Sequence, residues 1–269
     1  MSTRTDAPPP QSRRERRAAD RARGTSAARR SAPATARRGT PVFWITALVG
    51  VVAIVLVGGL VLLQGTGPAK FDASGLIAPT SLTPTSLADG RSLGKADAPV
   101  TLELWSDYQC PACAQYAEIV EPELVADYVT PGVLRIVHRD AAFQGVRAGG
   151  SYDESVESAA GARCAAEQGR YWPFHDWVFA NHNGENKGAY ADARLRAMAT
   201  SAGLDVTAWD ACRATGDQQR AVRAETEQGS AGGIGSTPTL IINGETIVGV
   251  RPASELGAKI EAAAAAAGS

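Results

Sequence analysis

Several common signatures of function are missing from this sequence of 269 residues. It contains no internal repeat, no Ser-His-Asp arrangement and no phosphate-binding glycine loop. Its 28 glycines and 15 prolines are too few and too aperiodic for a collagen-like or low-complexity chain. A hydrophobic content of 44% also excludes a wholly disordered chain. The sequence therefore indicates a protein with at least one globular domain.

Cysteine and histidine are also scarce. The chain has three histidines and four cysteines, namely Cys110, Cys113, Cys164 and Cys212. A structural zinc ion needs about four such ligands, and no second close pair accompanies Cys110 and Cys113. We therefore expect neither a metal nor any other bound cofactor.

The charge is distributed unevenly along the chain. Residues 1–41 hold eleven arginines and no lysine against three acidic residues, whereas the remainder has sixteen basic and twenty-five acidic residues. Because the basic character is local, the main domain is not expected to bind nucleic acid. Residues 1–41 also lack apolar periodicity, which predicts a disordered tail.

A run of 22 residues without charge occupies residues 42–63. As a helix rising about 1.5 Å per residue it would be roughly 33 Å long, enough to cross a bilayer core of about 30 Å. No convincing small-residue cleavage site follows it, which favours an uncleaved anchor over a signal peptide. Because the arginines precede the run, we expect a single-pass protein of the cell membrane with a cytoplasmic N-terminus and an extracytoplasmic remainder.

Residues 64–93 are rich in Gly, Ser, Thr, Pro and Ala, which predicts a flexible linker. Residues 94–266 are then of suitable size for one domain. Its apolar patterns predict strands at 99–105, 133–138, 239–243 and 246–250, and helices at 110–128, 253–266 and within a block at about 152–230. This order predicts an α/β fold with a helical insertion.

The motif Cys110-Pro111-Ala112-Cys113 follows the first predicted strand and begins the next helix. Proline suits the first helical turn, where a missing N–H group costs nothing. Cys110 then lies at the helix N-terminus, where the helix dipole favours an anion and lowers the thiol pKa. Cys113, one turn away on the same face, can attack a mixed disulfide formed at Cys110. This arrangement predicts thiol–disulfide exchange.

The other two cysteines, Cys164 and Cys212, lie in predicted helices of the insertion. Outside the membrane an even number of cysteines usually indicates disulfides. A bridge between these two would close about 49 residues and contribute roughly 4 kcal/mol in the chain-entropy model. Because neither has a C-x-x-C neighbour, we favour a structural disulfide over a second redox relay.

Three segments of the chain together resemble a known family. The segments WSDYQCPAC, SAAGARCAAEQGRYWPFHDWVFANH and GSTPTLIINGETIVG are similar to DsbA-type thiol–disulfide oxidoreductases, above all the membrane- or lipid-anchored proteins of Gram-positive bacteria. The resemblance covers about residues 94–266 and implies a thioredoxin fold interrupted by a helical domain. It implies that Cys110 attacks and Cys113 resolves, that Pro238 is a cis-proline facing the active site, and that Thr237 offers backbone hydrogen bonds to the substrate.

The sequence departs from this family pattern at two positions. Ala112 stands where the best-known oxidant of the family has a histidine that stabilises the thiolate. Leu104 stands where many relatives have a buried glutamate, and strand alternation directs the neighbouring Glu103 to the opposite face. His138 could tune Cys110 or be a structural histidine, and Asp107 could cap the helix or place a charge near the thiolate.

The resemblance implies an extracytoplasmic thiol:disulfide oxidoreductase that donates disulfides to reduced exported proteins. A DsbB-like or VKOR-like membrane protein would reoxidise it, and we expect a monomer. Two alternatives stay open. One is a membrane-anchored disulfide reductase, for example in cytochrome c maturation. The other is a non-catalytic binding module in which Cys110–Cys113 is only a structural disulfide.

Overall fold

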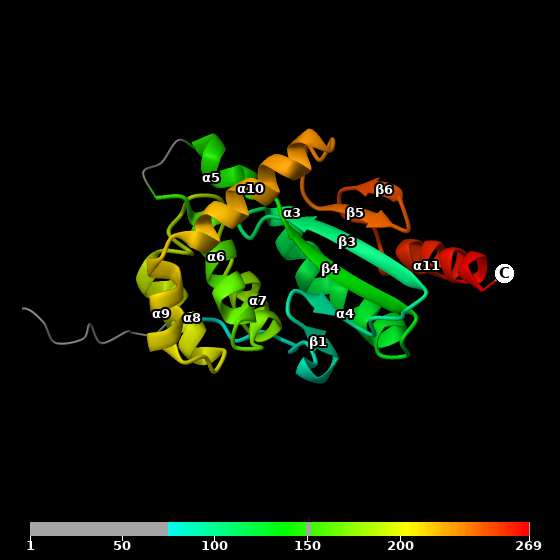
Figure 1. Cartoon of the computed structure of the whole chain (residues 1–269), viewed down its shortest axis with the longest axis horizontal. Coiled ribbons are helices and arrows are strands. Elements are labelled where there is room, and N and C mark those ends of the chain that lie inside the picture. The colour runs from blue at the N-terminus through cyan, green and yellow to red at the C-terminus, as the bar shows by residue number, and fades with distance from the viewer. Residues whose placement is uncertain (1–74, 149–151, 269) are drawn as a thin grey trace, which may run out of the picture. The chain divides into compact units, whose positions relative to one another are not determined.

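A computed structural model describes residues 75–148 and 152–268 and contains a six-stranded mixed sheet (Figure 1). The strand order is β1-β2-β4-β3-β5-β6, in which β3 and β4 are parallel and the other neighbours are antiparallel. The strands are β1 (Ala88–Asp89), β2 (Ser92–Leu93), β3 (Val100–Ser106), β4 (Leu134–Asp140), β5 (Thr239–Ile242) and β6 (Glu245–Val248).

The two central strands bury alternate side chains on opposite faces of the sheet. Leu102 and Leu104 of β3 lie in the main hydrophobic core, whereas Trp105 packs with Ala141 and Ile234 in a second cluster. Because successive side chains of a strand point to opposite faces, one strand supplies both clusters. Helices cover both faces of the sheet, as the α/β pattern of the sequence predicts.

The helix that begins at the C-x-x-C motif runs from residue 111 to residue 129. It consists of α3 (Pro111–Gln115), a π-helical turn η2 (Tyr116–Val120), α4 (Glu121–Leu124) and a second π-helical turn η3 (Val125–Val129). Pro122 has no N–H group to donate within the helix, and wider π turns accommodate such a break in the hydrogen-bond ladder. The C-terminal helix α11 (Ala253–Ala267) packs against α4, β3 and β5.

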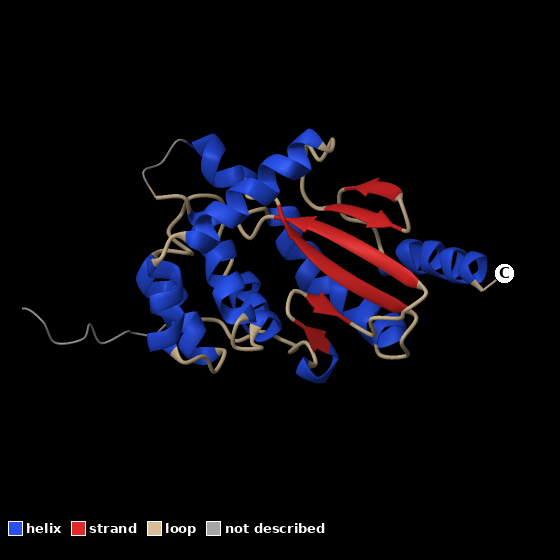
Figure 2. Ribbon diagram, in the orientation of Figure 1, coloured by secondary structure: helices blue, strands red, loops and turns tan. Residues whose placement is uncertain are grey.

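The helical insertion lies between β4 and β5 and is grouped to one side of the sheet (Figure 2). Side chains fix where two of its helices begin, because Asp153 caps α6 through the Val156 N–H group and Asp205 caps α9 through the Thr207 N–H group. Its helices are α5 (Phe143–Ala148), α6 (Glu154–Ala166), α7 (Tyr171–Ala180), α8 (Asp192–Ser201), α9 (Val206–Ala214) and α10 (Asp217–Ala231). The predicted α/β fold with a helical insertion is therefore confirmed.

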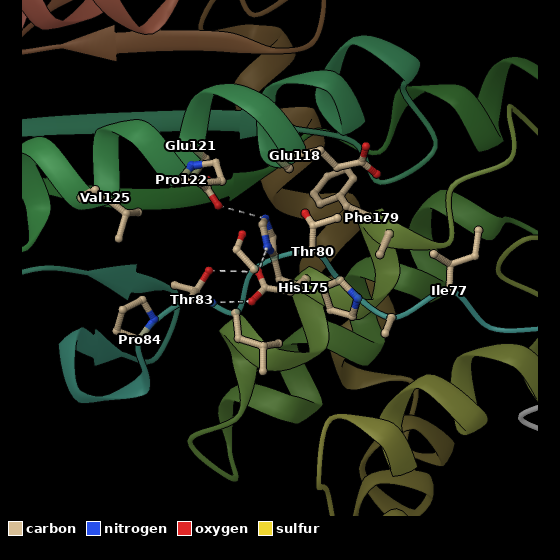
Figure 3. A pocket seen from close by; sticks show the side chains of 18 of the residues that line it. Ile77, Thr80, Thr83, Pro84, Glu118, Glu121, Pro122, Val125, His175 and Phe179 are labelled. Carbon is tan, nitrogen blue, oxygen red and sulfur yellow. Dashed lines mark hydrogen bonds and ion pairs between the residues drawn. The ribbon is translucent and has the colours of Figure 1, made fainter.

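The predicted linker at 64–93 was wrong from residue 76 onward. Residues 77–84, which we call the strap, run along α7 (Figure 3). Thr83 donates from its N–H and hydroxyl groups to the two oxygens of Asp176, at 2.7 and 3.0 Å, and the Ile77 N–H donates to Asn181 Oδ1 at 2.9 Å. The short helix η1 (Thr85–Leu87), β1 and β2 follow, and β2 pairs with β4. Composition alone could not reveal this, because serine, threonine and proline also suit an extended segment that bonds to a helix.

A cluster of charged side chains joins the sheet to the insertion. Glu225 of α10 accepts hydrogen bonds from Arg91 and Arg163, each at 2.6 Å, and Arg163 also donates to Asp140 of β4 at 2.5 Å. Burial would raise the pKa of Glu225, but the hydrogen bond and charge of Arg91, with the charge of Arg163, lower it to about 2. The carboxylate therefore stays ionised and paired at neutral pH.

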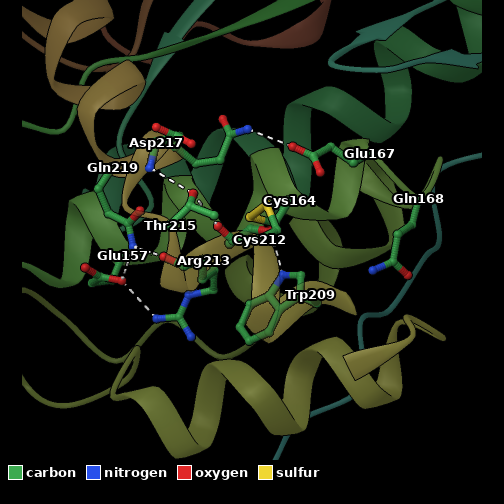
Figure 4. Close-up of a disulfide and its surroundings, with 12 residues drawn as sticks. Glu157, Cys164, Glu167, Gln168, Trp209, Cys212, Arg213, Thr215, Asp217 and Gln219 are labelled. Carbon is green, nitrogen blue, oxygen red and sulfur yellow. Dashed lines mark hydrogen bonds and ion pairs between the residues drawn. A yellow bond between two sulfur atoms is a disulfide. The ribbon is translucent and has the colours of Figure 1, made fainter. Parts of the chain in front are cut away.

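The second cysteine pair is a disulfide in the structure. Cys164 of α6 and Cys212 of α9 are joined, with 5.9 Å between their Cα atoms (Figure 4). Beside them Trp209 Nε1 donates to the carbonyl oxygen of Gly161 at 2.8 Å, which also binds α9 to α6. Both cysteines are remote in the chain from the motif, and the bridge lies wholly within the insertion.

No helix within residues 75–148 and 152–268 is long and apolar enough to cross a membrane. The predicted tail at 1–41, the predicted membrane span at 42–63 and the first part of the predicted linker lie outside the described residues.

Replacing both Cys164 and Cys212 with alanine should destabilise the insertion without removing thiol exchange. The disulfide closes a loop between residues 48 apart, and loss of such a crosslink costs about 2–4 kcal/mol of unfolding free energy. Urea unfolding of the oxidised wild type and the double variant measures the difference. An unchanged unfolding midpoint would contradict a structural role, and unchanged reactivity of the motif cysteines is the matched control.

Candidate active site

The motif lies where the central strand ends and the first helix begins. Strand β3 ends at Ser106, and Cys110 is the N-cap of α3, in extended backbone conformation with φ −76° and ψ 121°. Pro111 is the first helical residue, and the carbonyl group of Cys110 accepts the first helical hydrogen bond from Ala114 at 3.0 Å. Both motif cysteines are free thiols, Cys110 5% exposed and Cys113 1% exposed. Both thiols are thus buried, and Cys110 is slightly the more exposed of the two.

The surroundings of Cys110 favour its thiolate. A hydrogen bond from the Cys113 thiol, together with the Thr237 side chain and the backbone N–H groups of Cys113 and Ala112, lowers the pKa of Cys110 to about 5 against the opposing effect of burial. The two backbone donors are free N–H groups of a helix N-terminus, which stabilise an anion. Ala112 contributes through its backbone, so its methyl side chain supplies none of this stabilisation.

Cys113 has the opposite tendency. Burial, and then the hydrogen bond and charge of Cys110, raise the pKa of Cys113 well above its usual value, and hydrogen bonds from Ser106 and the Asp107 N–H group offset this only in part. One negative charge shared by the pair therefore resides on Cys110. A thiolate is the form of cysteine that attacks disulfides, so Cys110 is the more reactive of the two thiols.

Thr237 and Pro238 lie beside Cys110 although they are far away in the chain. The Cys110 thiol donates to the Thr237 carbonyl oxygen at 3.3 Å, and the Thr237–Pro238 peptide bond is cis. The sheet brings them together, because Thr239 begins β5 and pairs with Trp105 near the end of β3. Thr237 thus presents backbone groups at the reactive sulfur, where an extended substrate chain could bond to them.

Asp107 is a buried acid between β3 and the motif. Its Oδ1 accepts hydrogen bonds from the Gln109 N–H at 2.9 Å and the Ser155 hydroxyl at 2.7 Å, and its Oδ2 accepts one from the Gln144 N–H at 2.8 Å. Burial raises its pKa to about 6, with a further rise from the charge of Cys110, although these three donors oppose the shift. Asp107 therefore ties the motif loop to α5 and α6 and places a negative charge near Cys110.

Sequence reasoning missed Gln109 and His182. Gln109 is fully buried, its side chain donates to Ser155 at 3.1 Å and accepts from the Asn186 N–H group, and its carbonyl oxygen is 2.9 Å from His182 Nε2. The place of Gln109 directly before Cys110 was a signal for its importance. His182 follows α7 in a polar loop, and nothing in its sequence context points to the motif.

Glu103 and His138 do not contact the motif cysteines. Glu103 is half-buried and lies 3.5 Å from Arg139 Nε in an ion pair. His138 is buried in an aromatic cluster beside Tyr108 and Tyr171. Burial lowers the pKa of His138 well below its usual value, so it is neutral at physiological pH. Within the described part of the chain, no three His, Cys, Asp or Glu side chains are grouped to hold a metal ion.

Comparison with known proteins gives one matching family model and relatives that match over part of their length. Residues 86–262 match the family model described as Thioredoxin. The curated Na(+)/H(+) antiporter NhaA 3 of Salinispora tropica is 29% identical over 151 residues, which cover 56% of this chain and 21% of that protein. The probable disulfide bond formation protein D of Bacillus cereus is 32% identical over 92 residues, which cover 34% of this chain and 40% of that protein. The aligned regions thus span about a fifth and two fifths of the lengths of these relatives.

Among solved structures, oxidised BdbD from Bacillus subtilis has a TM-score of 0.57 with 21% identity, over 70% of this chain and 98% of that chain. At this identity the likeness concerns the fold, which includes both the sheet and the helical insertion.

A direct test of the electrostatics is to titrate the Cys110 thiolate of the reduced protein by its absorbance near 240 nm. We expect a midpoint near pH 5. Cys113→Ala should raise it, because the Cys113 thiol is the largest stabilising contact. In Cys110→Ser, the remaining Cys113 should stay protonated to above pH 9. A titration midpoint near pH 9 in the wild type would contradict the lowered pKa of Cys110.

Asp107→Asn should change both thiol acidity and the pH dependence of stability. Without the nearby negative charge, the pKa of Cys110 should fall further. The folded protein holds the Asp107 proton more tightly than the unfolded chain, so its contribution to stability should decline from about pH 4 to about pH 6 and be constant above. Urea unfolding at stepped pH should show this decline in the wild type and in the exposed control Asp127→Asn, and a smaller one in Asp107→Asn. If stability depended on pH identically in the wild type and in Asp107→Asn, the raised pKa of Asp107 would be contradicted.

Proposed function

The chain belongs to the thioredoxin family, and we propose that within it this protein is a thiol:disulfide oxidoreductase that donates disulfides to exported proteins. The observation behind this proposal is the unequal acidity of Cys110 and Cys113. An exchange catalyst needs one cysteine that is stable as a thiolate and a second that stays protonated, and the pKa shifts of Cys110 and Cys113 support these two roles.

The exchange starts from the Cys110–Cys113 disulfide. A substrate thiolate attacks the Cys110 sulfur, a mixed disulfide forms, and the Cys113 sulfur leaves and takes up a proton, as its raised pKa requires. A second thiolate of the substrate then attacks the substrate sulfur that is bonded to Cys110. Cys110 leaves as a thiolate, the substrate holds a new disulfide, and two electrons have passed to the enzyme. The low pKa of Cys110 makes it a good leaving group in this second step.

The same pKa values favour oxidation of substrates over their reduction. Stabilising the Cys110 thiolate stabilises the reduced enzyme, which makes its disulfide more oxidising by about 30 mV for each pKa unit. A pKa of about 5 lies between the roughly 7 of thioredoxin and the roughly 3.5 of DsbA. Ala112 at the position of the family histidine agrees with this intermediate value. The reductase alternative requires a potential as low as that of thioredoxin.

We also propose that residues 42–63 anchor the protein with its N-terminus in the cytoplasm and its catalytic domain outside. The uncharged apolar run and the arginines before it support this orientation. The disulfide between Cys164 and Cys212 supports an oxidising compartment. A membrane oxidant of the DsbB-like or VKOR-like type would then return the Cys110–Cys113 pair to the disulfide after each cycle.

The midpoint potential of Cys110–Cys113 tests the proposal, measured in glutathione buffers with the Cys164–Cys212 bridge followed separately by mass. We expect a value on the order of −200 mV, above the roughly −270 mV of thioredoxin. In addition, the Cys110 thiolate of Cys113→Ala should attack oxidised glutathione, release one glutathione thiolate and accumulate as a mixed disulfide, whereas Cys110→Ser should form none. A potential at or below that of thioredoxin would reverse the direction of electron flow, and activity in Cys110→Ser would reduce the motif to a structural disulfide.

A further inference from the structure

A cavity of about 580 Å³ lies between the strap, the 111–129 helix and α7 (Figure 3). This volume is within the range of about 300–1,000 Å³ of ligand-binding sites. Neither motif cysteine lines it, and neither does Thr237. The exchange chemistry described above therefore leaves the cavity without a role.

Two buried polar atoms in the wall of this cavity form no hydrogen bond with any described residue. They are Glu121 Oε2 and His175 Nε2, whose residues are 2% and 1% exposed. The two side chains point toward one another in Figure 3 and form an ion pair in which His175 Nε2 lies 3.9 Å from Glu121 Oε1, a separation longer than a hydrogen bond. Burial raises the pKa of Glu121 to about 7, although the charge of His175 opposes this shift. A ligand that donates a hydrogen bond to the unpartnered oxygen would stabilise the ionised form, so this wall favours such a ligand.

Acidic groups outnumber basic ones around the cavity, where His175 is the buried group that pairs with Glu121 and Asp176. Glu118, Glu121 and Asp176 contribute carboxyl groups, and none of the lining residues is a lysine or an arginine. Both oxygens of Asp176 are already bonded to the strap, whereas Glu121 keeps one oxygen without a partner. This distribution selects a cationic donor rather than a neutral or anionic one.

The rest of the lining is largely apolar. Ile77 and Leu82 of the strap are 66% and 64% exposed, and Val125, Phe179 and Pro122 contribute further apolar surface. Large apolar side chains that remain exposed beside a concave site are typical of binding surfaces. A ligand for this cavity should therefore combine a positive charge with an apolar body.

The cavity is also placed to receive a chain that is bound at Cys110. Ala117, which lines it, follows Cys110 by seven residues on the same helix, about 10 Å along the axis. His182, at the same end, contacts the Gln109 carbonyl oxygen directly before Cys110. An extended polypeptide covers this distance in about three residues and reaches the level of Glu121 in about five.

We propose that the cavity binds a lysine or arginine side chain, flanked by apolar residues, of the polypeptide that exchanges its thiols at Cys110. The cationic group donates to Glu121 Oε2 while the aliphatic stem packs on Val125 and Phe179. This proposal rests on the proposed function and deepens it, because it specifies substrates with a basic residue about three to five positions from the reacting cysteine.

Matched dithiol peptides test the preference on the full chain. Each peptide carries lysine or norleucine within an apolar stretch, four residues before or after the reacting cysteine. The measured quantity is the second-order rate constant with which each peptide reduces the Cys110–Cys113 disulfide. We expect the lysine peptide to react about tenfold faster in the wild type on one side of the cysteine, the effect of one charge-assisted hydrogen bond.

Three variants distinguish the cavity from general electrostatics. Glu121→Gln removes the charge and Ala117→Leu fills the space, so both should bring the lysine-to-norleucine ratio close to one. Glu123→Gln removes an exposed carboxylate of the same helix outside the cavity and should keep the wild-type ratio. Because each ratio is taken within one variant, partial loss of folded protein does not affect it. A ratio of one in the wild type, or a ratio that both cavity variants leave unchanged, would overturn the proposal.

Peptides with serine in place of both cysteines separate this proposal from the proposed function. Their binding to the full chain, followed by NMR, should favour lysine over norleucine and should lose that preference in Glu121→Gln. If no dithiol peptide reduces the motif disulfide, the proposed function fails, while selective binding of the serine peptide still supports the cavity. Equal binding of the two serine peptides contradicts the cavity whatever the exchange rates are.

Discussion

The arrangement of the site depends on the hydrogen bonds that converge on the Cys110 sulfur at the point where strand β3 gives way to helix α3. Two of those donors are the backbone N–H groups of Ala112 and Cys113, which are free because the chain leaves the sheet at Ser106 and enters the helix at Pro111. The same turn buries Cys113 beneath Cys110. Charge separation within the pair is therefore a property of the strand-to-helix junction, and the Thr237 segment is added to it by the pairing of β5 with β3.

The helical insertion fixes the position of this strand-to-helix junction. Asp107 reaches α5 and α6 through Gln144 and Ser155, and Gln109 is held by Ser155, His182 and the Asn186 N–H group. Deeper in the molecule, Glu225 and Asp140 share Arg91 and Arg163 between the sheet and the helices. The loop before Cys110 is thus fixed by two helical segments that follow it by more than thirty residues. The Asp107 carboxylate holds this loop in place, and its negative charge also disfavours the Cys110 thiolate.

Much of the site could be predicted from the sequence because its determinants are local. The spacing of Cys110 and Cys113, the proline between them and the preceding strand pattern are all contained in a dozen residues. Thr237 and Pro238 were found only by resemblance, because their place beside Cys110 depends on sheet order. The roles of Gln109, Ser155 and His182 depend on how the insertion packs, which no periodicity encodes. The strap was mistaken for a linker because its bonds to Asp176 and Asn181 are made across a sequence separation of about a hundred residues.

The strap also determines how a mechanical load on the N-terminal side of the domain would be distributed. The chain bonds to α7 through Ile77 and Thr83 before it enters the edge strands β1 and β2. A pulling force from that side would first act on these few bonds, and α7, packed in the body of the insertion, would resist it. The hydrogen bonds between β2 and β4, and with them the sheet that supports the cysteine pair, would remain unloaded until the strap detached.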